Sequence, residues 1–174
     1  MPSLSYTSRR ELEEHSFPPA VTLLVPVAAI LLQVLITKLS WRMGIVDLPL
    51  LVAIFFAVSR RNPMAGTLTG MLIGLLQDAL TAQPIGVNGM AKSVIGYIAA
   101  SIGVQVDVEN LTTRVLINFG FSLLNSVLLF LINRRLLDNA DFHLLWLHEL
   151  LRALVNTLVA VPLFLLLDRT RRID

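Results

Sequence analysis

The chain has 174 residues, of which 55% are hydrophobic and 15% are charged, and its formal net charge is +2. Soluble domains carry about 25% charged residues, so this composition, with its recurrent apolar runs of membrane-spanning length, indicates a small polytopic membrane protein. The absence of cysteine excludes disulfides, thiolate metal sites and cysteine nucleophiles. The basic residues are scattered at segment ends and form no continuous patch, so no nucleic-acid partner is predicted.

The apolar segments predict an all-α bundle of about six transmembrane helices in a single domain, residues 20–168. A short cytoplasmic N-terminal arm (residues 1–19) is expected before this domain, and a cytoplasmic basic tail (residues 169–174) after it. The expected spans are residues 20–39, 45–59, 64–80, 87–104, 112–132 and 144–167.

The second segment is short and carries Asp47 and Pro49 near its start. We therefore expect it to enter the membrane as irregular backbone or as a tilted, shielded half-turn. Trp41 and Arg42, just before it, are typical of a membrane interface.

The basic residues predict the orientation of the bundle through the positive-inside bias. If the N-terminus is cytoplasmic, one group shares that side: Arg9, Arg10, Arg60, Arg61, Arg114, Arg169, Arg171 and Arg172. The opposite side receives only Lys38, Arg42, Arg134 and Arg135. Both termini are therefore predicted to be cytoplasmic.

A glycine series runs along the third segment. Gly66, Gly70 and Gly74 recur every four residues, and Asp78 takes the next step of the same series. On a helix this spacing places all four on one face, where the missing side chains let another backbone approach closely. The series predicts a helix-packing face, either within the fold or toward a partner.

A turn and a second charge follow this series. Pro84 and Gly86 supply turn chemistry, and Lys92 lies about as far beyond the turn as Asp78 lies before it. A helical hairpin would bring the two charges to similar depth, where they could pair. A charge in hydrocarbon costs roughly 2.5–3.5 kcal/mol on insertion scales, so it needs a reason to be there. We favour a structural or assembly role over a proton or substrate relay.

Polar residues also mark the last two predicted spans. Asn118, Ser122 and Asn125 follow helical spacing and are expected to hydrogen-bond across helices. In the sixth span, a second face at a predicted membrane boundary combines His148, Glu149, Arg152 and Asn156.

His and Glu are general acid–base residue types, but an amphipathic helix end next to Trp146 is the simpler interpretation of this second face. The chain has no HExxH, GxSxG or phosphate-loop motif, so neither enzymatic activity nor a metal or cofactor is predicted. A ligand-binding stripe stays open as the alternative. It would combine Asn118, Ser122, Asn125, Glu149 and Arg152.

The run GLLQDALTAQPIGVNGM (Gly74–Met90), together with the spaced glycines and the upstream Asp47-x-Pro49, resembles the rod shape-determining protein MreD family. Chain length, span count and the predicted location of both ends agree with this family. Over the rest of the chain the resemblance rests on hydropathy and length.

The resemblance implies a non-enzymatic scaffold in the bacterial inner membrane. Such a protein would bind MreC and link actin-like MreB filaments to peptidoglycan synthesis. Contact with RodA and its penicillin-binding transpeptidase would be indirect, and membrane lipid surrounds the helices. The family is also similar to the substrate-binding subunits of energy-coupling-factor transporters. That similarity implies an alternative, a membrane subunit that binds a vitamin-type small molecule on its outer side.

Overall fold

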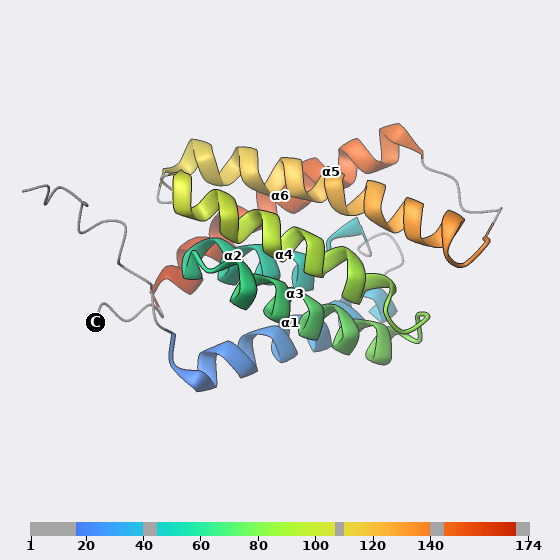
Figure 1. Cartoon of the computed structure of the whole chain (residues 1–174), viewed down its shortest axis with the longest axis horizontal. Coiled ribbons are helices and arrows are strands. Elements are labelled where there is room, and N and C mark those ends of the chain that lie inside the picture. Colours follow the sequence, from blue (N-terminus) through green and yellow to red (C-terminus); the bar gives the residue numbers. More distant parts are fainter. Residues whose placement is uncertain (1–16, 40–44, 107–109, 140–144, 170–174) are drawn as a thin grey trace, which may run out of the picture.

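A computed structural model describes residues 17–39, 45–106, 110–139 and 145–169 of the chain. These residues form six α-helices, shown in Figure 1: α1 (Pro19–Leu39), α2 (Leu48–Arg60), α3 (Pro63–Thr81), α4 (Val87–Gln105), α5 (Leu111–Arg135) and α6 (Trp146–Asp168). The all-helical fold is confirmed, and the predicted spans match these helices closely. Most of the predicted N-terminal arm, Trp41, Arg42 and most of the basic tail lie outside the described residues.

Helix α2 lies at the centre of the bundle and packs against all five other helices. Every residue from Leu48 to Ser59 is buried. Helices α3 and α4 run antiparallel along one side, α1 packs against α2 and α3, and α5 packs against α4 and α6 (Figure 1). The sequence LPLLVAIFFAVSR is apolar all round, as expected of a helix that is enclosed on every side.

Four of the six helices are long and apolar enough to cross a membrane, namely α1 (from Ala20), α4, α5 and α6. With 13 residues, α2 is only about 20 Å long, which is shorter than the ~30 Å hydrocarbon core. Helix α3 has 19 residues, but its glycines, threonines, Gln77 and Asp78 lower its hydropathy. The predicted number of helices is therefore confirmed. Of the six predicted spans, only four are confirmed as helices that are long and apolar enough to cross a membrane.

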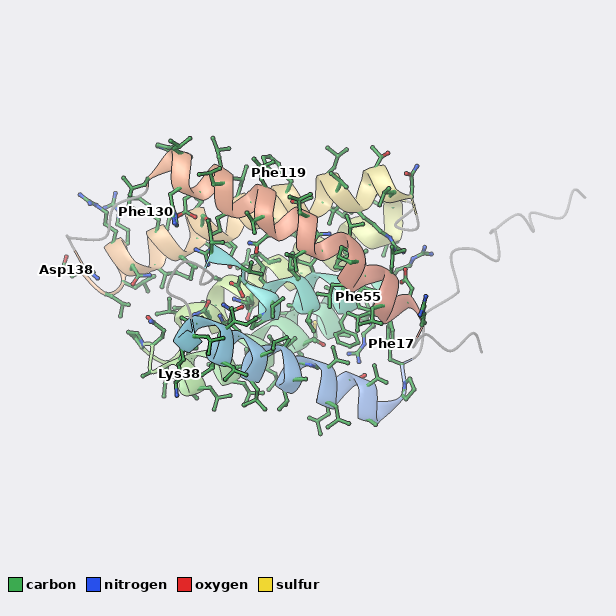
Figure 2. All side chains as sticks on the ribbon, turned by 180° about the vertical axis from the view of Figure 1, so that it is seen from behind. Phe17, Lys38, Phe55, Phe119, Phe130 and Asp138 are labelled. Atoms are coloured by element: carbon green, nitrogen blue, oxygen red, sulfur yellow. The ribbon has the colours of Figure 1, made fainter. Side chains whose placement is uncertain are left out.

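The start of α1 and the end of α6 lie at the same end of the bundle. Figure 2 shows Phe17 at this end and Lys38 and Asp138 at the other. The Phe55 ring packs edge-on against Phe17 at 5.8 Å and against Phe164 at 5.1 Å between centroids. The two described chain ends are thus held together through α2, and which end faces the cytoplasm stays a prediction.

Candidate functional site

The glycine face of α3 packs against α4 of the same chain. Cβ atoms added at Gly66, Gly70 and Gly74 would overlap backbone atoms of Gly96, Lys92 and Asn88, respectively. Each glycine of the series on α3 therefore lies against a residue of α4, and these residues of α4 are also four positions apart, in the opposite chain direction. The close approach fixes the register of the hairpin, and it places the backbone of Lys92 directly opposite Gly70.

Asp78 caps the start of α4 from the end of α3. Its buried carboxylate accepts hydrogen bonds from the backbone N–H groups of Gly86 (2.9 Å), Asn88 (3.1 Å) and Gly89 (3.3 Å). The first N–H groups of a helix have no partner within the helix, and its N-terminus favours negative charge. Asp78 supplies both the acceptors and the charge.

Pro84 and Gly86, the two predicted turn residues, lie in the turn just before α4. Gly86 is the N-cap of α4 and has a φ of +104°, in the left-handed region that favours glycine. The Val87 N–H donates to the carbonyl of Pro84 at 3.3 Å. This compact turn brings the first backbone N–H groups of α4 to the Asp78 carboxylate.

Asp47 caps α2 in the interior of the bundle. Its Oδ1 accepts a hydrogen bond from the N–H of Leu50 at 3.0 Å, and Pro49 in the first turn has no N–H to satisfy. The Asp-x-Pro sequence thus starts a helix without leaving these first backbone positions in need of water as a hydrogen-bond partner. Of the two expected entries, irregular backbone is wrong, since an ordinary capped helix begins at Leu48. A tilt of this short helix in the membrane stays a prediction.

Two side chains from other helices complete this helix start. Gln33 of α1 accepts from the N–H of Leu48 at 3.1 Å, and Asn156 of α6 accepts from the N–H of Asp47 at 2.9 Å. Because water cannot reach these groups, each missing acceptor would leave a buried donor unsatisfied. The first turn of α2 therefore depends on α1 and α6.

Lys92 forms a buried ion pair with Asp47, not with Asp78. The distance from Lys92 Nζ to Asp47 Oδ2 is 3.1 Å, and the two side chains are 0% and 3% exposed. Asn88 lies between the two candidates: its Oδ1 accepts from Lys92 Nζ at 3.0 Å, and its Nδ2 donates to Asp78 at 2.8 Å. The direct pair of Asp78 and Lys92, which the sequence left open, is not formed, because the long lysine side chain extends to Asp47 at the start of α2.

The buried polar chain continues toward α6 and α5. Arg152 Nη2 lies 3.8 Å from Asp47 Oδ2, and Arg152 Nη1 lies 3.8 Å from Glu149 Oε2. Glu149 also accepts a hydrogen bond from Ser126 of α5. His148 lies 3.4 Å from Glu149 and is half exposed. We call the connected set the interior polar network; its members are Asp47, Asp78, Asn88, Lys92, Ser126, Glu149 and Arg152.

The side chains of the other residues of the predicted polar stripe on α5 make no described hydrogen bond to this network. Asn118, Ser122 and Asn125 are buried, and Asn118 donates to the Arg114 carbonyl within its own helix at 2.8 Å. Ser122 Oγ and the side-chain carbonyls of Asn118 and Asn125 have no hydrogen-bond partner among the described residues. The described bonds between α5 and α6 come instead from Ser126 and, at the far end, from the Arg114–Asp168 ion pair.

The chemistry of the network is that of helix assembly. Opposite charges are paired at short range. The carboxylates of Asp47 and Asp78 accept hydrogen bonds from the backbone N–H groups at the starts of α2 and α4, respectively. Within the ranges that the structure describes, no group of three His, Asp or Glu side chains could hold a metal ion.

The sequence interpretation missed Gln33, and it assigned Asn88 to the turn and missed its position between Asp78 and Lys92. Both residues carry amide side chains in apolar helices. An amide in such a helix indicates a hydrogen-bond partner on another helix. The sequence offers no way to tell that the partner of Gln33 is a backbone N–H of α2.

These features define a multi-pass membrane protein whose short central helix is anchored by charges and amides of the surrounding helices. The family model of the rod shape-determining protein MreD matches residues 16–170, nearly the whole chain. The chain belongs to the MreD family.

This family consists of structural shape-determining proteins and is not a known enzyme family. No curated protein and no solved structure matches the chain. The expected similarity to transporter substrate-binding subunits therefore gains no support, and the transporter alternative is not favoured.

Proposed function

We propose that the chain is a non-enzymatic scaffold of the bacterial cell-elongation machinery in the inner membrane. In this role it binds MreC and links MreB filaments to peptidoglycan synthesis, with RodA and its penicillin-binding transpeptidase contacted indirectly. Family membership supports the role in rod shape. The observation that carries the scaffold function is the burial of α2 along its length, because the centre of the bundle is filled by packed side chains.

The surfaces suited to partner helices are the exposed apolar faces. Leu31 of α1 is 55% exposed, Leu116 of α5 is 65% exposed and Leu158 of α6 is 73% exposed. In a bilayer such faces contact lipid or another transmembrane helix, whereas the glycine face of α3 is already covered by α4. A single-span partner such as MreC would therefore dock on one of these outer faces.

The chain contains no cysteine, which allows a direct test by crosslinking. Single cysteines are introduced at Leu31, Leu116 and Leu158, each carrying a photoactivatable crosslinker, and MreC adducts are scored in native membranes. The control is a cysteine at Ile30, which is fully buried beside Leu31. We expect an MreC adduct from at least one exposed position and none from position 30.

Purification of the tagged chain in mild detergent provides the second readout. Recovery of MreC with MreB or cell-wall synthesis proteins is the expected result. Recovery of a membrane coupling subunit with ATPases, or normal rod shape after deletion of the gene, would overturn the proposal.

A further inference from the structure

A groove of about 730 Å³ lies on the outside of the bundle between α1 and α3. Its walls are mostly apolar and include Leu23, Pro26, Val27, Leu68, Leu72 and Leu76. Leu23, Leu68 and Leu72 are more than half exposed, so the groove opens sideways toward the bilayer. None of the residues that line the groove belongs to the interior polar network.

One end of the groove carries a positive charge. Arg60, the half-buried last residue of α2, lines it together with Thr22 and Thr69. The Arg60 guanidinium donates to the hydroxyl of Thr22 at 2.9 Å and to that of Thr69 at 3.1 Å. It also lies over the Phe56 ring, 5.6 Å from the centroid.

These contacts orient the arginine without neutralising it. Both hydroxyl acceptors are uncharged, and together they use two of the five N–H donors of a guanidinium. No carboxylate oxygen of a described residue lies within ion-pairing distance of Arg60. A planar guanidinium held in this way is suited to an anionic phosphate group.

The length of the groove matches one leaflet of a membrane. From Ala65 to Leu76 along α3, the lining spans twelve residues, or about 16 Å over eleven steps of 1.5 Å. Half of the hydrocarbon core is about 15 Å. Arg60 is the last residue of α2, close to the start of α3 and to the end of the bundle where lipid headgroups are expected, and the apolar lining continues along α3 to Leu76, five residues before that helix ends.

We propose that this groove binds an anionic phospholipid. The phosphate of the headgroup contacts Arg60, and an acyl chain lies between α1 and α3. The guanidinium beside an apolar groove favours a lipid with an anionic headgroup over an apolar partner helix, which would cover the arginine without supplying an anion.

The headgroup contact is tested on the full chain reconstituted in nanodiscs of phosphatidylcholine with increasing phosphatidylglycerol. Lipids retained after extraction are counted by native mass spectrometry. We expect about a fivefold preference for phosphatidylglycerol, the effect of roughly one basic residue on one anionic headgroup. Arg60→Gln should abolish it, whereas Arg135→Gln should not, because Arg135 is exposed at the opposite end of the bundle. Equal loss in both variants, or persistence in Arg60→Gln, would overturn the proposal.

A second measurement leaves Arg60 intact, in case its replacement disturbs folding. A fluorophore is attached to a single cysteine at Leu72 in the groove or at Leu158 on α6, which is also more than half exposed and lies outside the groove. Phosphatidylglycerol with a nitroxide on its acyl chain should quench the fluorophore at position 72 at a severalfold lower mole fraction than at 158. Equal quenching at the two positions, or equal quenching by labelled phosphatidylcholine at position 72, would show only bulk lipid contact and refute the site.

Discussion

The Asp47 carboxylate caps α2 through one oxygen and accepts a hydrogen bond from the Lys92 ammonium through the other, at 3.1 Å. The same residue therefore starts the central helix and fixes its position against α4. Loss of either partner leaves the other charge buried and unpaired.

Replacement of Lys92 by Met should lower the free energy of unfolding by about 3–5 kcal/mol, the cost of breaking a buried ion pair on one side. Adding Asp47→Asn should restore part of this loss, because the double variant removes both charges and keeps a capping oxygen at position 47. The measurement is unfolding in mixed micelles, with Lys38→Met, an exposed lysine, as the control. Additive losses in the double variant would contradict the pairing.

Replacement of Asp78 by Ala should cost about 2–3 kcal/mol, because charge-assisted hydrogen bonds to the start of α4 are lost. Asp78→Asn should cost less, since one acceptor oxygen stays. In a double-mutant cycle, Asp78 should couple to Lys92 more weakly than Asp47 does, because Asn88 separates them. A stronger coupling to Asp78 would show that the ion pair is the one expected from the sequence.

Gly70→Ala should destabilise the fold by at least about 1–3 kcal/mol, because the added methyl group overlaps the Lys92 carbonyl. Gly120 in α5 provides a matched control, since a Cβ there meets nothing within 4 Å. Gly120→Ala should be neutral or stabilise by up to about 1 kcal/mol through helix propensity. Similar effects of the two alanines would refute the role of the glycine face.

Gln33→Leu should cost about 1–3 kcal/mol, because the N–H of Leu48 loses its acceptor in the interior. Gln83→Leu, at an exposed position, serves as the control. Amide hydrogen exchange offers a local readout: the first turn of α2 should lose protection in Gln33→Leu, while α5 should not. Unchanged protection at Leu48 would show that another group replaces the glutamine.

The helices were predictable because apolar runs of spanning length are a local signal that does not depend on the tertiary structure. The glycine face was also readable, because a four-residue spacing fixes a face whatever the tertiary structure. The partner of Lys92 was not predictable. Asp47 lies 45 residues away, and only the inward position of α2 brings it closer to Lys92 than Asp78. The hydrogen-bond partners of the polar stripe on α5 were not predictable for a similar reason, since helical spacing gives a shared face but not the atoms opposite it.

The cap of α2 also has a consequence for biogenesis. The backbone N–H of Asp47 finds its acceptor on Asn156, which lies 109 residues later in the chain. At about 5–20 residues per second, a ribosome needs roughly 5–20 s to make that distance. During this interval the central helix has emerged but its first turn is incomplete. We therefore expect nascent chains that stop before α6 to expose this turn and to be targets for membrane chaperones or proteases, so that the bundle reaches its final form only after α6 has been made.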